Sequence, residues 1–272
     1  MKYFSAFILL AVISYTGSQI IKQELHDDSF KAETNDLRIQ GGEKTTIKKF
    51  PYMISVHTTN GLRGAAVIIN KYWGLTAGII FYRYMNGTLT FRAGSTQQNR
   101  GKILKVDKYF DHPKYSGGWT DDLTIFKFTK PIKISNTMKP ISIASSLPKN
   151  GTMVTVSGWG DEEWMKENSG TTQLKAVKVK YVHSKTCQPL YQDDIDDGNF
   201  CSLTPGRSPC AFDWGAPVMH QQKLIGIYVG GEDCGSITKP PLYLDLTRYR
   251  QWILDTIRKN SKSYEIDEIN IE

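Results

Sequence analysis

Beyond its first residues, the sequence lacks any apolar run long enough to cross a membrane. The one long apolar run, from Phe4 to Ile13, follows Lys2 and is itself too short to span a bilayer. Small and polar residues follow up to Ser18, which is the pattern of a secretory signal peptide. We therefore expect residues 1–18 to be removed and the product to be secreted, with no membrane partner.

Cysteines are few, and none is arranged as zinc ligands usually are. The chain has only Cys187, Cys201, Cys210 and Cys234, with no Cys-x-x-Cys pair and no nearby pair of histidines. This spacing argues against a zinc site, and we expect neither a metal nor a cofactor. An even number of cysteines in a secreted chain instead predicts two disulfides, for which three pairings are possible.

Basic runs are also missing, although the chain is basic as a whole. Its 34 Lys and Arg against 27 Asp and Glu give a net charge of +7, with a pI near 9.0. These residues are scattered, and no segment resembles the basic arm of a nucleic-acid-binding protein. We therefore expect no nucleic-acid partner and only a weak preference for acidic surfaces.

The sequence is instead rich in short β-type runs separated by turn residues. The predicted strands are Met53–Val56, Ala65–Ile69, Leu89–Ala93, Ile103–Phe110, Leu123–Phe128, Met153–Gly158, Gln173–Tyr181, Lys223–Tyr228 and Leu242–Leu246. Clear helical spacing appears only at Tyr249, Ile253 and Ile257. Many strands followed by one helix predict a closed, all-β architecture. The polar end, residues 261–272, is expected to fray.

Two further local patterns fit a secreted protein. Asn86 and Asn150 each begin an Asn-Gly-Thr sequon, which predicts glycosylation at the surface. Residues 19–38 are polar and aperiodic, and they end at the junction Arg38-Ile39-Gln40-Gly41-Gly42. A cleavable basic residue before Ile-x-Gly-Gly, at the start of the strand-rich region, resembles the activation junction of trypsinogen-like zymogens, which implies that residues 19–38 are a propeptide.

A series of motifs in a fixed order carries a family resemblance. They are Ile39-Gln-Gly-Gly, Trp73-Gly-Leu-Thr-Ala77, His112-Pro113, Asp121-Asp122-Leu123, Gly158-Trp159-Gly160, the loop Cys210–Pro217 and Trp252-Ile253. Together they resemble the trypsin-like serine proteases over residues 39–260. The resemblance implies two six-stranded antiparallel β-barrels, over about residues 39–145 and 151–247, followed by a C-terminal helix.

The same resemblance shows how the catalytic positions differ. A serine protease needs a hydroxyl nucleophile, a histidine that takes its proton and a carboxylate that orients the histidine. Ile79 stands at the histidine position, Trp214 at the serine position, and Asp122 matches the carboxylate. An indole has no oxygen or sulfur that can attack a carbonyl, and an alkyl group cannot move a proton. These positions predict that the chain is not an enzyme and that Asp122 is structural.

The resemblance also predicts changes at the sites that hold the substrate. Phe212 and Trp214 occupy the oxyanion-hole positions, where glycine would allow a backbone shape that Phe adopts only at some cost. Ser208 stands where trypsin-like enzymes have an aspartate at the base of the specificity pocket. Residues Val229-Gly230-Gly231 lack the usual tryptophan, and Pro241 adds volume at the pocket wall. We expect a blocked oxyanion hole and a degenerate pocket.

Other family features are retained. Asp213 is expected to pair with the new amino terminus at Ile39 after cleavage. One family disulfide has lost both halves, at Gly64 and Ile80. The disulfides that the resemblance implies are Cys187–Cys201 and Cys210–Cys234. The remaining histidines of the domain are expected on strand ends or loops without a catalytic role; they are His57, His112, His183 and His220.

Within the family, the chain resembles the inactivated protease paralogues of the scabies mite, which are similar to the group 3 trypsin-like allergens of dust mites. That resemblance implies secretion into the mite gut, release with faeces and interference with host complement. Our first hypothesis is therefore a catalytically inactive protein that binds host proteins, with complement components favoured. The second is a hydrolase with residual or unorthodox peptidase activity. The third is a decoy for protease inhibitors or substrates, which would need an open cleft.

Overall fold

The computed structural model describes residues 39–84, 88–160, 173–192, 194–231 and 234–266. The predicted signal peptide, the propeptide with Arg38, and the sequon residue Asn86 lie outside these ranges. The domain described below begins at Ile39.

The first barrel is built from residues 53–128. Its strands are β2 (Met53–Thr58), β3 (Gly61–Ile68), β4 (Trp73–Thr76), β5 (Thr90–Ala93), β6 (Lys102–Leu104), β7 (Val106–Asp111) and β8 (Thr124–Phe128). They are hydrogen-bonded in the order β6-β5-β2-β3-β4-β8-β7, and all pairs are antiparallel. Because only Lys105 separates β6 from β7, these two segments act as one strand that joins the two ends of the sheet.

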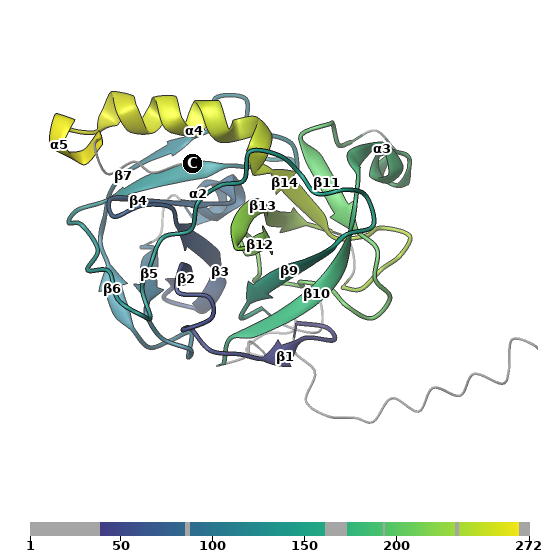
Figure 1. The fold of residues 1–272 in the computed structure, drawn as a ribbon, viewed down its shortest axis with the longest axis horizontal. Helices are drawn as coiled ribbons and strands as arrows, with labels where there is room; N and C mark the ends of the chain where they lie inside the picture. The colour runs from purple at the N-terminus through teal and green to yellow at the C-terminus, as the bar shows by residue number, and fades with distance from the viewer. Residues whose placement is uncertain (1–38, 85–87, 161–172, 193, 232–233, 267–272) are drawn as a thin grey trace, which may run out of the picture. The chain divides into compact units, whose positions relative to one another are not determined.

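The second barrel follows in the chain and closes by direct strand pairing. Its strands are β9 (Met153–Gly158), β10 (Lys175–Val182), β11 (Asn199–Ser202), β12 (Pro217–His220), β13 (Lys223–Gly230) and β14 (Leu242–Asp245), and β1 (Glu43–Lys44) is added at the edge of β10. The order β10-β11-β14-β13-β12-β9 is closed by pairing of β9 with β10. The predicted pair of six-stranded antiparallel barrels is thus confirmed (Figure 1).

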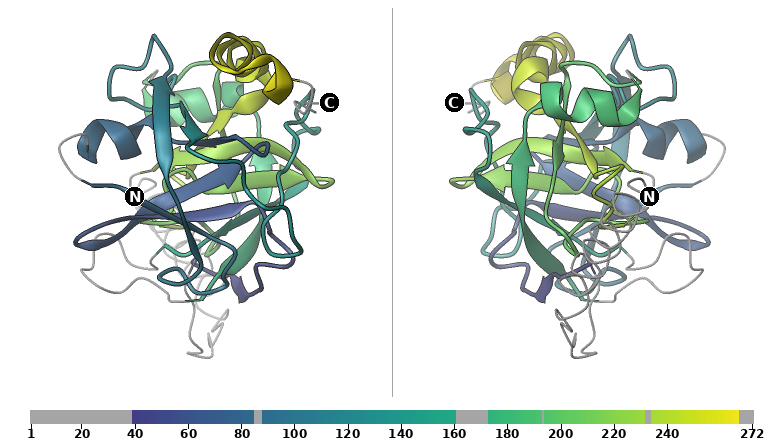
Figure 2. Two further views of the ribbon diagram at one scale, coloured as in Figure 1. Left: turned by 90° about the vertical axis from the view of Figure 1, so that its left-hand side faces the viewer. Right: turned by 90° about the vertical axis from the view of Figure 1, so that its right-hand side faces the viewer.

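Short helices connect the strands and one long helix ends the domain. The helical segments are α2 (Gly78–Tyr84), α3 (Ser184–Cys187), η1 (Gln188–Tyr191), α4 (Leu246–Asn260) and α5 (Ser263–Ile266). Helix α4 starts where the Asp245 side chain accepts a hydrogen bond from Thr247 N–H, a standard N-cap. It buries Tyr249, Ile253 and Ile257 and packs beside β13, as the four-residue spacing predicted. Figure 2 shows α4 along the same side of the domain in both views.

The expected fraying after α4 is wrong for residues 263–266. This segment forms α5, and Glu265 is only 5% exposed. Its carboxylate lies 2.6 Å from Lys127 Nζ, and Lys262 N–H donates to it at 3.0 Å. The ion pair anchors the chain end to β8 of the first barrel, a long-range contact that the polar composition of this segment does not reveal.

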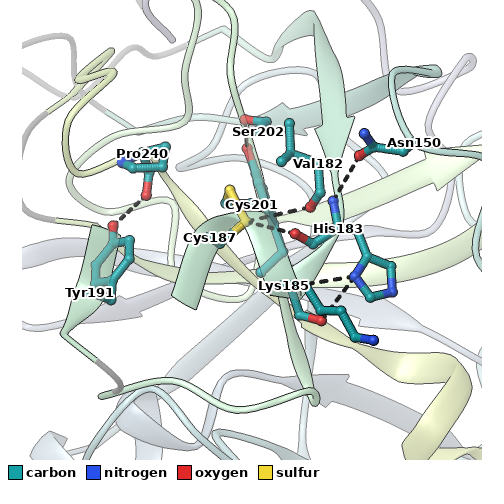
Figure 3. Close-up of a disulfide and its surroundings, with 11 residues drawn as sticks. Asn150, Val182, His183, Lys185, Cys187, Tyr191, Cys201, Ser202 and Pro240 are labelled. Atoms are coloured by element: carbon teal, nitrogen blue, oxygen red, sulfur yellow. Dashed lines mark hydrogen bonds between the residues drawn. A yellow bond between two sulfur atoms is a disulfide. The ribbon is translucent and has the colours of Figure 1, made fainter. Parts of the chain in front are cut away.

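Two disulfides cross-link the second barrel. They are Cys187–Cys201 and Cys210–Cys234, the pairs that the resemblance implies. Figure 3 shows the first, which ties α3 to β11. Near it, the Tyr191 hydroxyl donates to Pro240 O, and the sequon residue Asn150 accepts a hydrogen bond from His183 N–H at 3.0 Å. Asn150 is exposed. Its glycosylation remains a prediction.

Candidate functional site

The loop Cys210–Pro217 is held firmly against the first barrel. Trp214 O accepts a hydrogen bond from Ala65 N–H of β3 at 2.8 Å, and Gly215 N–H donates to Tyr228 O at 2.8 Å. Gly215 has φ +79°, and a Cβ there would lie 2.2 Å from Ala65 O, so only glycine fits. The loop therefore fixes where the side chain of Trp214 points, and that side chain is 8% exposed.

Rings and guanidinium groups surround Trp214. The Phe212 ring meets the Trp214 ring edge to face, with centroids 6.2 Å apart. Arg83 of α2 lies over the Trp214 ring at 5.7 Å, and Arg63 of β3 lies over the rings of Phe212 and Tyr84 at 5.6 and 5.8 Å. We call these five residues the aromatic–arginine cluster. Each contact is of cation–π or aromatic type, so the cluster is ordered by its own packing.

The backbone at Phe212 has the shape that glycine adopts without cost. Its φ is +65°, in the left-handed region that L-residues with a Cβ rarely occupy. Such a conformation costs on the order of 1–3 kcal/mol and persists only where the surroundings hold it. Two kinds of contact hold this conformation: the Asp213 N–H group donates to Cys210 O at 3.1 Å, and the Phe212 ring packs against the Trp214 ring.

Asp122 is buried and accepts a backbone hydrogen bond. The N–H of Ile79, at the start of α2, donates to Asp122 Oδ1 at 2.7 Å, and the Tyr115 hydroxyl approaches the same carboxyl. Burial raises the pKa of Asp122 to about 8, although these donors act in the opposite direction. In active relatives an imidazole would orient on this group. Here a backbone amide and a phenol stand beside it.

The position of the lost disulfide is filled by one side chain. Ile80 Cδ1 lies 2.5 Å from where a Cβ on Gly64 would sit, and Trp214 O lies 2.6 Å from it. Ile80 is fully buried, whereas its neighbour Ile79 is partly exposed. Substituting both former cysteine positions therefore leaves a packed site, because the Ile80 side chain takes up the space that a side chain at Gly64 would need.

Two of the predicted specificity-pocket residues, Gly231 and Pro241, lie against each other, and Trp119 lies against Gly230. Trp119 Nε1 is 2.8 Å from where a Cβ on Gly230 would lie, so the indole fills the space beside this glycine. A Cβ on Gly231 would meet Pro241 Cα at 3.3 Å. Ser208 is fully buried, and its hydroxyl donates to the neighbouring Pro209 O. Val229 is also buried. No sequence pattern singled out Trp119, because Gly230, which it contacts, is 111 positions further along the chain.

Ile39 and Asp213 both lie inside the domain. Each is 0% exposed, and a Cβ on Gly158 would lie 3.6 Å from Ile39 Cδ1 and would overlap the Asp213 carboxylate. That carboxylate accepts hydrogen bonds from Gly160 N–H at 2.7 Å and Cys210 N–H at 3.1 Å. The two residues thus share one site, and their pairing after cleavage of the junction remains a prediction.

The buried His57 and the partly buried His112 make contacts with residues other than Asp122. His57 Nε2 lies 3.0 Å from Ser55 Oγ and 2.9 Å from Gln98 O, and burial lowers its pKa. His112 Nδ1 lies 3.1 Å from Asp121 Oδ1. Burial lowers the pKa of this ring as well, although the negative charge of Asp121 acts to raise it. That neither histidine has a catalytic role remains a prediction.

The Trypsin family model matches residues 39–253, most of the chain and all of the strands described above. The chain belongs to the trypsin family. Trypsin delta and trypsin gamma of Drosophila erecta are each 31% identical to it over 224 residues, covering 80% of this chain and 88% of theirs. Trypsin alpha of Drosophila melanogaster is 29% identical and covers 81% of this chain and 88% of its own.

A solved structure shares the fold. Neuropsin, described as a serine protease expressed in the limbic system of mouse brain, superposes with a TM-score of 0.73 at 24% identity. The match covers 79% of this chain and 98% of neuropsin. At this identity the likeness shows the double-barrel fold alone.

These relatives contradict the prediction that the chain is not an enzyme. Proteins named trypsins are 31% identical to it over most of the domain, which points to a peptidase. The prediction rested on two side chains, Ile79 and Trp214, whereas the relationship extends over both barrels. The chemical constraint at those positions still holds: peptide hydrolysis here requires a nucleophile other than the Trp214 side chain, because an indole has no oxygen or sulfur lone pair to donate.

Two observations bear on localisation. Two disulfides in a trypsin-family domain fit a secreted protein, since disulfides persist in oxidising compartments. Within the described ranges, no helix is both long enough and apolar enough to cross a bilayer.

Proposed function

We propose that this trypsin-family protein is secreted and acts by binding other proteins through the aromatic–arginine cluster beside its cleft. Host complement components are the partner class, on the strength of the resemblance to the scabies mite paralogues. Release through the mite gut and faeces belongs to the same proposal. The observation that carries it is the position of Arg63, Arg83, Tyr84, Phe212 and Trp214 around a single loop.

The composition of this cluster favours protein binding. Trp, Tyr and Arg are the residue types most enriched where interfaces concentrate their binding free energy. Arg83 is exposed, and Arg63, Tyr84 and Phe212 are partly exposed, so a partner can reach them. The stacked contacts already hold the guanidinium groups in place, so binding would cost less side-chain entropy than it would for free arginines.

A pocket next to the cluster adds shape to this surface. It has a volume of about 240 Å³ and is lined by His57, Leu62, Arg63, Asn99 and Phe212 among others. It is large enough for one side chain of a partner. Arg63 on its wall favours an acidic side chain there, since a guanidinium binds a carboxylate through two parallel hydrogen bonds.

Part of the proposal concerns the family's substrate sites. The bulk of the Phe212 and Trp214 rings supports a blocked oxyanion hole, whereas the φ of +65° at Phe212 keeps the backbone shape that a glycine would have there. Trp119 against Gly230, and Pro241 against Gly231, support a specificity pocket that no longer admits a peptide side chain. A partner would then bind at the rim of the cleft. The same filling argues against the decoy hypothesis, which needs the cleft to be open.

The relatives favour a second candidate, a peptidase. Their names point to peptide hydrolysis, and for this chain that activity would have to be residual or unorthodox, using a group other than Ile79 and Trp214. Such an enzyme would turn over activated esters or peptides that reagents directed at an active serine leave untouched.

One experiment separates the two. The domain cleaved after Arg38 is assayed on broad peptide and ester substrates, and then added to a serum complement lysis assay. Dose-dependent inhibition of lysis at stoichiometric amounts supports binding. Turnover with no effect on lysis supports the peptidase, and inactivity in the lysis assay contradicts the complement proposal.

A further inference from the structure

Two neighbouring pockets lie on a surface that shares no lining residue with the aromatic–arginine cluster. One, of about 340 Å³, is lined by β1, by strands β9 and β10 and by Arg207. The other, of about 560 Å³, is lined by the segment before β2, by residues 135–142 and by Met219 of β12. Both are larger than the 240 Å³ pocket beside Phe212.

The two pockets are adjacent. Lys49 lines both of them. In addition, Thr155 of the first pocket is paired with Met219 of the second across the β9–β12 ladder, so the two residues are neighbours on the sheet. A ligand longer than one pocket can therefore occupy both.

Positive charge is concentrated along this surface. The charged residues that line the two pockets are Lys44, Lys48, Lys49, Lys139, Lys178 and Arg207, together with one acidic residue, Glu43. All six basic side chains are exposed. Five of them, all except Lys44, form no ion pair with any residue that the structure describes. Uncompensated like charges repel one another, and an anionic ligand would relieve that repulsion.

We propose that this basic surface, formed by the six cationic residues named above, binds a sulfated glycan chain. Sulfate groups would pair with the lysines and with Arg207. The same pockets offer what the sugar rings need: Pro51, Pro140 and Met219 as apolar contacts, and Ser135, Asn136 and Ser142 as hydrogen-bonding groups. A linear polymer with a sulfate on each repeat would engage both pockets at once, which raises the apparent affinity over that of a single unit.

A nucleic acid fits this surface less well. Proteins that bind single strands stack bases on exposed aromatic rings. The aromatic residues that line the two pockets are Tyr52 and Phe50, which are 5% and 7% exposed. The Tyr52 hydroxyl is also engaged, since it donates to Met219 Sδ at 2.7 Å. Neither ring presents a face on which a base could stack.

The test compares two variants that lose the same charge. The first, Lys49→Ala/Lys139→Ala/Arg207→Ala, removes three cations of the basic surface. The second, Lys102→Ala/Lys108→Ala/Lys223→Ala, removes three exposed lysines that line neither pocket. All six positions are exposed, so both variants should fold, which circular dichroism checks. Binding to immobilised heparin is measured as a function of salt, with fully desulfated heparin and single-stranded oligothymidylate as the comparison probes.

We expect the first variant to lose at least about tenfold in heparin affinity and to show a smaller dependence of affinity on salt, since fewer counterions are released. The control should change by less than about threefold, because only the general field weakens. Equal losses in both variants would overturn the proposal, because the binding would then follow net charge alone. It would also fail if native heparin did not bind, if desulfated heparin bound equally well, or if the oligonucleotide bound more tightly.

Discussion

Trp119 lies over Gly230, with its indole Nε1 2.8 Å from where a Cβ on that glycine would be. Gly230 also has φ +150°, which side chains with a Cβ rarely adopt. The Trp119 indole therefore occupies the space that a side chain at position 230 of β13 would need.

This relationship predicts that Gly230→Ala destabilises the domain by about 2 kcal/mol or more, because the new methyl group overlaps the indole and the backbone is strained. Urea unfolding measures the loss. Two glycines at which an added methyl group would have nothing within 4 Å serve as controls, Gly118 without a positive φ and Gly61 with φ +101°. Gly61→Ala reports strain alone, and a Gly230→Ala loss no larger than this would show that the indole does not clash.

The carboxyl of Asp122 predicts a pH dependence of stability. Its pKa of about 8 in the folded chain lies above its ordinary value of 3.8, so between these pH values the folded state binds more protons than the unfolded state. Stability contributed by this group is therefore full below pH 4 and lost as the pH rises through 8. Asp122→Asn should remove this loss, worth no more than about 6 kcal/mol.

The measurement is thermal unfolding of wild type and Asp122→Asn at pH 6.5, 7.5, 8.5 and 9. His57 and His112, whose pKa values burial lowers in the folded chain, are present in both proteins, so their titration cancels in the difference between wild type and variant. The difference between the two proteins should grow in favour of the variant with pH. A difference that stays constant from pH 6.5 to 9 would show that Asp122 does not titrate near pH 8 in the folded chain.

The ion pair between Lys127 and Glu265 predicts that the chain end contributes to stability. Glu265→Gln removes one partner of a pair whose side chains are 13% and 6% exposed, and should cost about 1–3 kcal/mol because Lys127 keeps its charge in a partly buried site. Glu43→Gln, at an exposed position, is the matched control and should be near neutral. Guanidinium unfolding gives both values, and equal values would mean that α5 is not held by this pair.

The side chain of Trp214 predicts the outcome of a kinetic comparison. Since an indole cannot attack a carbonyl, Trp214→Phe should leave any turnover of peptide or ester substrates within about twofold of wild type. Phenylalanine keeps an aromatic ring beside Phe212 and Arg83, so the loop should stay packed. A loss of more than about tenfold in kcat/KM in a folded variant would assign Trp214 a direct part in the reaction.

Local patterns predicted much of this fold. The β-type runs found β9 with its observed bounds, and alternating side chains marked β10, where Val177 and Val179 are buried and Lys178 is exposed. Strands β1, β4, β11 and β12 were not predicted as strands; each has at most four residues and is defined by pairing with its neighbours in the sheet. Strand formation there depends on pairing, which a local window does not contain.

The site, too, could be predicted only where local sequence decides its structure. The backbone cost at Phe212 could be predicted because the residue type conflicts with the shape expected at its position, and its φ is +65°. The contacts of Trp119, Tyr115, Arg63 and Arg83 could not, since each depends on distant segments meeting in space. The family resemblance identified the positions of the site. The side chains that fill the cleft became known only from the packing of the two barrels.

The most direct test of the binding account measures the affinity of purified complement components for wild type, for Arg63→Ala/Phe212→Gly and for Arg248→Ala. The double variant removes two members of the aromatic–arginine cluster and relieves the strained φ at residue 212, whereas Arg248 is a half-exposed side chain on α4. We predict that at least one component binds wild type and Arg248→Ala alike, and the double variant at least about tenfold more weakly. Equal affinity for all three proteins, or no binding to wild type, would contradict the account.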